Sequence, residues 1–282
     1  MAAEIAFSSW DEFKVNWLTK VAEVQEREFK KKAHPSTPFN MSKLLLFRGQ
    51  RLASYTLRSS FDRVMAAHGL GRNHFIESRF NDFMNRFIDA RADAGLGNGE
   101  GRYIGAGTVP DRSMLNMAAI AQHNGLPTRL LDWSRSPYVA AFFAFVSDEP
   151  PVGEAAIWCM DFGRITSEKC VRASDVTIWQ SQINGNLRQA AQHGAFSLNL
   201  TNEMDLENVF LPASAFMHRD PQTEILFKLV IPRSERSRVL EDLNLMRINY
   251  LSLFPDEDGV IKYLNWQLNE KEFSDPNKKW NN

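Results

Sequence analysis

The sequence of 282 residues predicts a single α+β domain whose helices lie mostly in its N-terminal half. Three observations predict this class. Apolar residues make up 44% of the chain, which is ample for a buried core. Helical spacing of apolar side chains dominates the first half, whereas short apolar runs typical of strands recur in the second. No internal repeat and no long linker divides the chain.

The first predicted helix spans residues 10–32, because Phe13, Trp17 and Val21 recur at spacings of four. Two prolines in segment 34–38 then exclude a helix. An apolar run at 44–47, ended by Gly49, predicts a buried strand. Further helical patterns cover residues 51–67, 74–92 and 113–122.

A sharp helix start is predicted at Ser136 and Pro137, which suit the N-cap and the first helical position. This helix continues through Phe145, and its Ala and Phe residues predict burial on most sides. Apolar runs predict a strand that ends at 130–131 and strands at 155–160, 195–200 and 224–231, the last central in its sheet. Helices are expected at 237–246 and 260–268, and the tail 274–282 is expected to fray.

Charge and cysteine content narrow the functional classes. Lys and Arg total 33 and Asp and Glu total 34, so a globally basic nucleic-acid binder is not expected, although a local basic groove is compatible. Cys159 and Cys170 do not make a disulfide framework, and no close set of Cys and His predicts a metal site. No secretory signal and no membrane-spanning stretch is visible, so we expect a cytoplasmic protein without a membrane partner.

The most distinctive segment is 122–134, which reads Gln-His-Asn-Gly-Leu-Pro-Thr-Arg-Leu-Leu-Asp-Trp-Ser. It brings an imidazole, a hydroxyl, a guanidinium and a carboxylate to one turn and the end of a buried strand. Such groups need partners, because an unpaired buried charge is strongly destabilising. Two interpretations stay open: Arg129 pairs with Asp132 while Thr128 caps a turn, or these side chains converge on a polar ligand.

Two other segments carry groups that suit a ligand. Arg48, at the end of the first strand, can hold a diphosphate or carboxylate bidentately, and Gly49 allows close backbone approach. Segment 188–196 brings the amide of Gln192 and the imidazole of His193 to a strand junction. A structural ion pair of Arg48 and ordinary surface polar groups are the simpler alternatives.

These segments resemble the FRG-domain family, which is named for its Phe/Tyr-Arg-Gly motif. The matching motifs are Phe47-Arg48-Gly49-Gln50, Arg-Ser-Ser-Phe at 58–61, segment 122–137, Gln192-x-Gly194-x-Phe196 and segment 253–264. They run in order along nearly the whole chain. The resemblance implies a single FRG-type domain over residues 1–273, with an N-terminal helix at 9–33 and a core at 40–268. The chain departs from the family at position 124, where Asn replaces the usual aromatic residue.

A more distant similarity is to ADP-ribosyltransferases of the arginine–serine–glutamate type, and it implies an ADP-ribosyltransferase-like mixed β-sheet core. Those enzymes carry an aromatic-Arg motif on the first core strand. Later they have a serine-bearing strand with a Pro-x-x-Ala-x-x-Phe helix, and then a strand with a catalytic Glu. Phe47-Arg48-Gly49 resembles the first motif and segment 132–144 the second, while Gln192 occupies the place of the Glu.

This similarity implies NAD as a substrate, with no metal. Arg48 would hold the pyrophosphate, Ser134 would support the nicotinamide ribose, and His123 would bind ribose hydroxyls or take a proton. Bond cleavage builds positive charge on the ribose, and Gln192 offers no negative charge, so Asp132 or Glu224 would supply the anion. The implied catalytic set is Arg48, His123, Asp132 and Gln192, and the implied cofactor-binding set is Arg48, Gly49, Thr128, Arg129 and Ser134.

Three functions therefore stay open. The first is an NAD-consuming ADP-ribosyltransferase-like enzyme or NAD glycohydrolase. Such an enzyme would be a bacterial toxin or phage-defence effector with a macromolecular acceptor and a possible neutralising partner. The second is a non-catalytic nucleotide- or RNA-binding module that uses Arg48, Arg129 and a stacking Trp133. The third is an adaptor domain in which the polar side chains of segment 122–134 bind one another through internal hydrogen bonds and stabilise the fold.

Overall fold

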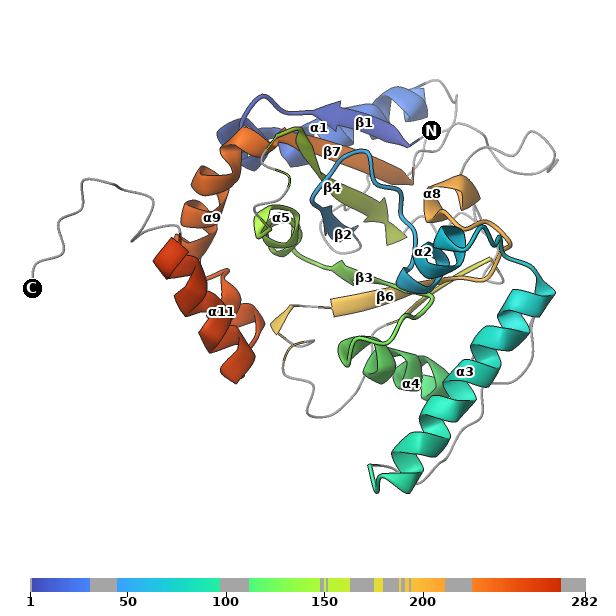
Figure 1. The fold of residues 1–282 in the computed structure, drawn as a ribbon. Helices are drawn as coiled ribbons and strands as arrows, with labels where there is room; N and C mark the ends of the chain where they lie inside the picture. Colours follow the sequence, from blue (N-terminus) through green and yellow to red (C-terminus); the bar gives the residue numbers. More distant parts are fainter. Residues whose placement is uncertain are drawn as a thin grey trace, which may run out of the picture.

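The computed structural model describes residues 2–30, 45–96, 112–147, 150, 152–162, 175–179, 188, 191–192, 194–210 and 225–269. Within these ranges a mixed seven-stranded sheet carries helices on its faces (Figure 1). The strands are β1 (Ala3–Ala6), β2 (Leu45–Gln50), β3 (Leu130–Ser134), β4 (Glu154–Asp161), β5 (Val176–Trp179), β6 (Gly194–Asn199) and β7 (Leu226–Pro232). The α+β prediction is confirmed.

The helices of the described residues precede, separate and follow these strands. They are α1 (Trp10–Lys30), α2 (Ser60–Ala67), α3 (His74–Asp93), α4 (Arg112–His123), α5 (Pro137–Phe145), α8 (Leu206–Val209), α9 (Arg236–Leu245), α10 (Tyr250–Leu253) and α11 (Glu257–Gln267), with a 3₁₀ turn η2 (Arg233–Glu235) before α9. None of the helices in the described residues combines the length and the apolar character that crossing a membrane requires.

The sheet is divided between β2 and β3. Its order is β1-β7-β4-β2-β3-β6-β5, with β1 parallel to β7 and the other neighbours antiparallel. β2 pairs with β4 along its whole length, and β3 does the same with β6. In contrast, β2 and β3 share the single pair Phe47–Ser134. The two halves of the sheet therefore separate beyond this pair.

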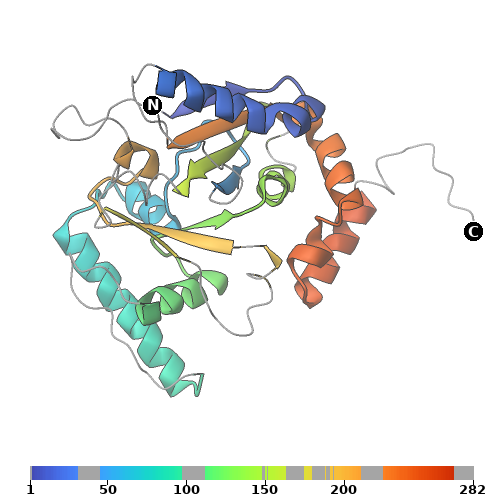
Figure 2. The same cartoon turned by 180° about the vertical axis from the view of Figure 1, so that it is seen from behind.

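Two groups of helices cover the same face of the sheet, one over each half. Phe13, Phe145 and Leu240, from α1, α5 and α9, pack with Phe47 and Phe227 on the half that holds β2, β4 and β7. Side chains of α2, α3 and α4 form a second apolar cluster with β3 and β6. In Figures 1 and 2, α3 and α4 lie at the opposite end of the molecule from α1. The opposite face packs against Leu57 and α8.

Helix α5 lies unusually close to β2, and Gly49 makes this approach possible. A Cβ atom at position 49 would lie 1.9 Å from the carbonyl oxygen of Ala140. The start of α5 follows the sequence prediction, since Ser136 accepts a hydrogen bond from the N–H of Val139 at 3.3 Å and Pro137 occupies the first turn. Gly49 therefore serves the packing of a helix on a strand.

The predicted helix over 51–67 is wrong in its first half, because α2 begins only at Ser60. Ser59 caps this helix by accepting a hydrogen bond from the N–H of Asp62 at 3.1 Å. Before it, tertiary contacts engage the backbone: Leu57 is buried and its N–H donates to Glu207 at 2.8 Å. Local helical spacing does not report such contacts.

Strand limits also differ from the predictions. β2 continues through Gln50, so Arg48 and Gly49 lie inside the strand, and β3 begins at Leu130, where a strand end was expected. β1 and β5 are short strands at the two edges of the sheet that were not predicted. β7 is paired on both sides, but the middle position belongs to β2. The predicted tail at 274–282 and the residues Cys170, His193 and Glu224 lie outside the described residues.

Candidate functional site

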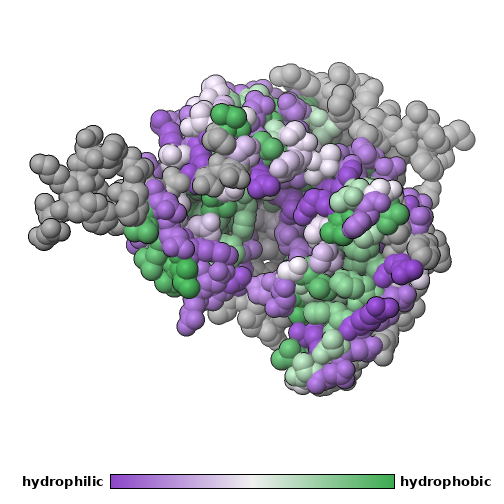
Figure 3. Space-filling model, in the orientation of Figure 1, coloured by the Kyte–Doolittle hydropathy of each residue, from purple (hydrophilic) through white to green (hydrophobic). Residues whose placement is uncertain are grey.

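A cavity of about 460 Å³ lies at the division between β2 and β3. The space-filling view is hollowed near the middle of the face that Figure 1 presents (Figure 3). Strands β2, β3 and β6, helices α4 and α5, and the segments before β6 and before α11 line the cavity. Its side walls include the aromatic residues Phe143, Phe196 and Phe254, and its polar residues are Arg48, Gln122, His123, Asp132, Ser134, Arg188 and Gln192.

Arg48 reaches the cavity from the middle of β2. Its Nη1 donates to the carbonyl oxygen of Asp132 at 2.7 Å and lies 3.6 Å from the carboxylate of the same residue. Nε is buried and has no hydrogen-bond partner among the described residues. Burial lowers the pKa of the Arg48 guanidinium, which nevertheless remains charged at neutral pH. A guanidinium group that is charged and keeps an N–H group without a hydrogen-bond partner can bind an anion.

Asp132 projects from β3 into the cavity, and its side chain is 59% exposed. Gln122, near the end of α4, donates its Nε2 to both carboxylate oxygens at 2.7 Å. The proposed internal pairing of Asp132 with Arg129 is therefore wrong, because the partners of this carboxylate are Gln122 and Arg48. Asp132 presents a negative charge to the cavity while its orientation is fixed by neighbours.

The cavity lining also includes His123, Ser134 and Gln192, which the sequence predicted as site residues. His123 is the exposed last residue of α4. The buried Ser134 hydroxyl donates to the carbonyl oxygen of Gln192 at 2.8 Å. The Gln192 side chain donates to the carbonyl oxygen of Leu253 at 3.1 Å. Gln192 precedes β6, and its amide ties the segment to α10, so it lies off the strand that was expected to carry it.

Arg188 lines the cavity near α11. It lies in segment 188–196, but the sequence did not predict it as a site residue. Its guanidinium donates to Asp256 and, at 3.2 Å, to Asp258, and it lies 5.2 Å from the ring centre of Phe254. The hydrogen bond from Arg188 lowers the pKa of Asp256 to about 2. Asp256 also caps α11 by accepting from the N–H of Gly259 at 3.0 Å. The charge of Arg188 is thus already balanced by two carboxylates.

Thr128 and Arg129, predicted to bind a cofactor, do not belong to the cavity lining. Thr128 is fully buried, and its hydroxyl donates to Gln122 Oε1. Arg129 is buried, and its Nη2 donates to the carbonyl oxygen of Asn199 at 2.8 Å. Gly49 is among the lining residues, but the close contact of its backbone is with α5. These three residues support the fold around the cavity.

Trp133, considered as a stacking platform, is buried, and its indole N–H donates to Ser197 at 2.8 Å. Its side chain belongs to the apolar cluster on the opposite face of the sheet. Trp133 and Phe47 are also among the lining residues of the cavity, together with Phe143, Phe196 and Phe254. The sequence did not predict Phe196 or Phe254 as site residues, although both lie in motifs that carried the family resemblance.

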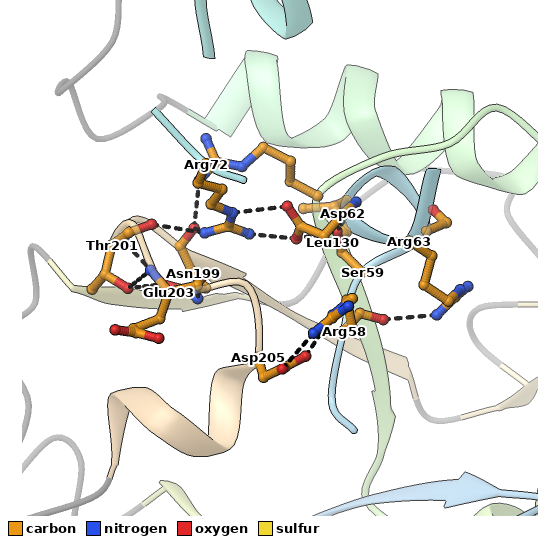
Figure 4. A network of polar contacts seen from close by, with 12 residues as sticks. Arg58, Ser59, Asp62, Arg63, Arg72, Leu130, Asn199, Thr201, Glu203 and Asp205 are labelled. Atoms are coloured by element: carbon orange, nitrogen blue, oxygen red, sulfur yellow. Dashed lines mark hydrogen bonds and ion pairs between the residues drawn. The ribbon is translucent and has the colours of Figure 1, made fainter. Parts of the chain in front are cut away.

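A second arginine cluster lies beside α2 and includes no lining residue of the cavity (Figure 4). Arg72 donates through Nε and Nη2 to both oxygens of Asp62, at 2.8 and 2.6 Å. Its Nη1 donates to the carbonyl oxygens of Asn199 and Thr201, at 3.0 and 2.8 Å. Every nitrogen of this guanidinium has a partner. The cluster ties α2 to the segment that follows β6.

No group of three or more His, Cys, Asp or Glu side chains in the described ranges is placed to hold a metal ion. The cavity combines the guanidinium of Arg48 on β2, the carboxylate of Asp132 on β3, the imidazole of His123 on α4 and aromatic side chains.

Residues 43–151 match the family model of the FRG domain. This match confirms the resemblance for the motifs within these residues, whereas the motifs at 192–196 and 253–264 and the domain extent of 1–273 stay predictions. It includes Arg48, His123, Asp132 and Ser134, whereas Arg188, Gln192 and Phe254 lie beyond its end. No curated protein and no solved structure matches the chain.

Proposed function

We propose that the cavity binds NAD or a closely related nucleotide and cleaves the bond between nicotinamide and ribose, as an ADP-ribosyltransferase-like enzyme would. The observation that carries this proposal is the juxtaposition of Arg48 and Asp132, which project from separated strands into one cavity with aromatic walls. The Arg48 guanidinium, whose Nε has no hydrogen-bond partner among the described residues, suits the pyrophosphate. The aromatic side chains suit a base.

The chemistry assigns a role to each charged group. Arg48 would hold the pyrophosphate oxygens through its guanidinium group. As the bond from ribose C1′ to the pyridinium nitrogen breaks, its electron pair stays with nicotinamide, which leaves as a neutral molecule. Positive charge develops on the ribose, and the Asp132 carboxylate would stabilise it. Water or an acceptor then forms the new bond to C1′ and loses a proton, for which His123 is the available base.

A specific observation favours a second candidate, a nucleotide-binding module without catalysis. The Asp132 carboxylate already accepts two hydrogen bonds from Gln122, and Gln192 is engaged with the Leu253 carbonyl. Both side chains are therefore already engaged by protein groups, which suits a site that holds a nucleotide without reacting with it. In this case the ligand would be retained intact.

The test combines binding and product analysis. Isothermal titration calorimetry with NAD measures affinity, and chromatography measures released nicotinamide. We expect Arg48→Lys to weaken NAD binding at least about tenfold, because lysine does not reproduce the planar fork. Arg135→Lys is the matched control, since Arg135 is exposed and does not line the cavity. Its affinity for NAD should equal that of the wild type.

Each outcome separates the candidates. Release of nicotinamide that Asp132→Asn abolishes supports the enzyme, whereas NAD binding without release supports the binding module. Absence of NAD binding in the wild type contradicts both. The role as a toxin or phage-defence effector in the cytoplasm, the macromolecular acceptor and the neutralising partner remain proposals. Incubation with cell extract and a search for ADP-ribosyl adducts tests the acceptor.

A further inference from the structure

A directed chain of hydrogen bonds ends at the Asp132 carboxylate. The N–H of Leu130 donates to the Thr128 hydroxyl at 3.3 Å, and this hydroxyl donates to Gln122 Oε1. Gln122 Nε2 then donates to both oxygens of Asp132 at 2.7 Å. This series of hydrogen bonds links the buried turn before β3 to the cavity.

The chemistry of the groups fixes the direction of this chain. Gln122 Oε1 has no hydrogen, so it can only accept, and the Thr128 hydroxyl must donate to it. The amide of Gln122 is therefore oriented with its nitrogen toward Asp132. Because that nitrogen can only donate, both carboxyl oxygens of Asp132 accept from it, and the two contacts fix the orientation of the Asp132 side chain.

The start of the chain is anchored in the interior. Thr128 is fully buried, and its carbonyl oxygen accepts from the N–H of Phe61 at 3.0 Å and from the Ser60 hydroxyl at 3.1 Å. The Thr128 N–H in turn donates to the Ser60 hydroxyl at 3.0 Å. These contacts hold Thr128 against the start of α2, so the orientation of Gln122 is set by a rigid part of the fold.

We propose that Gln122 is a positioning residue that holds the Asp132 side chain toward the cationic part of a bound ligand. This rests on the proposed function for the nature of the ligand. It also specifies the substrate class, because oxidised NAD carries a positive nicotinamide ring and NADH carries a neutral one. Among the described residues, the basic side chains that line the same cavity as Asp132 are Arg48 on β2, His123 on α4 and Arg188 before β6.

The first experiment needs no ligand. NMR of ¹³C-labelled aspartate follows the titration of the Asp132 carboxyl, with Asp132→Asn providing the assignment. Gln122→Glu is nearly isosteric and can still accept from Thr128, but it turns a carboxylate toward Asp132. We expect this variant to take up a proton at higher pH than the wild type, because two adjacent carboxylates repel each other and share a proton. An unchanged titration would overturn the proposal.

The second experiment measures ligand preference. We expect the wild type to bind NAD about tenfold more tightly than NADH, and Gln122→Met to bring this ratio close to one. Thr128→Val and Thr128→Ser are a matched pair, since only Ser retains the donor. The ratio should fall in the Val variant and be retained in the Ser variant. Equal ratios in wild type, Met and Val variants contradict the positioning role.

The two proposals fail in different ways. If the wild type binds neither nucleotide, the proposed function is wrong, while the carboxyl titration still decides whether Gln122 controls Asp132. If the wild type binds NAD but neither the titration nor the ratio responds to Gln122, the proposed function stands and the positioning role is wrong. Loss of folding in Gln122→Met leaves the Thr128 pair to decide the matter.

Discussion

Arg72 and Arg48 are two arginines in very different states of pairing. Arg72 is 3% exposed, and its partner Asp62 is 1% exposed. All three nitrogens of the Arg72 guanidinium donate to a carboxylate or to carbonyl oxygens (Figure 4). Arg48 is 20% exposed and donates one hydrogen bond, to the Asp132 carbonyl, while its buried Nε has no partner in the described ranges.

The difference shows how the surroundings of a guanidinium separate a structural role from a binding role. A buried charge is tolerated when all its hydrogen-bonding groups have partners. When one partner of a buried ion pair is removed, the other stays buried without compensation, and the protein is strongly destabilised. A charge beside a cavity that keeps unused donors is available to a ligand. We therefore expect substitution of Arg72 to lower mainly the free energy of unfolding, and substitution of Arg48 to lower mainly the affinity for a ligand.

The largest effect is expected for Arg72→Met. This change leaves the Asp62 carboxylate buried without its cation, and breaking such a pair costs about 3–5 kcal/mol of unfolding free energy. Urea denaturation measures the loss. Asp62→Leu combined with Arg72→Met removes both charges and should recover part of the stability. A loss below about 1 kcal/mol for Arg72→Met would contradict the structural role assigned to this cluster.

The second effect is expected at Gly49, which lies beside Arg48 but faces α5. In Gly49→Ala the new methyl group would meet the Ala140 carbonyl oxygen and the Ala144 nitrogen, at 1.9 and 2.7 Å. Because both contacts are backbone, α5 must move, and overpacking of this kind costs about 1–3 kcal/mol. Urea denaturation again measures the cost. Gly71→Ala is the control, since a Cβ there meets nothing within 4 Å.

Local signals in the sequence predicted much of the fold. The cap at Ser136 and Pro137 predicted the start of α5, and apolar spacing predicted α3 and α4 to within a residue or two. β1 and β5 were missed, because each has four residues and exists through pairing with a distant strand. Only the three-dimensional sheet supplies that information.

The candidate site was predictable in part for a similar reason. Arg48, His123, Asp132 and Gln192 line one cavity, and their catalytic roles stay predictions. The motif did not reveal that Arg129 turns toward the Asn199 carbonyl. Its direction depends on where β3 begins and on the division of the sheet, which is set by pairing with β4 and β6. Local sequence carries no record of these distant partners.

The smallest effect on stability is expected for Arg48→Met, the same replacement as at Arg72. It removes one hydrogen bond to the Asp132 carbonyl, but it also removes a buried donor without a partner, so the two contributions offset each other. The unfolding free energy should change by less than about 1 kcal/mol. NAD binding, measured by calorimetry, should be lost. A large destabilisation by Arg48→Met would mean that this guanidinium holds the divided sheet together, and a structural role would then replace the binding role.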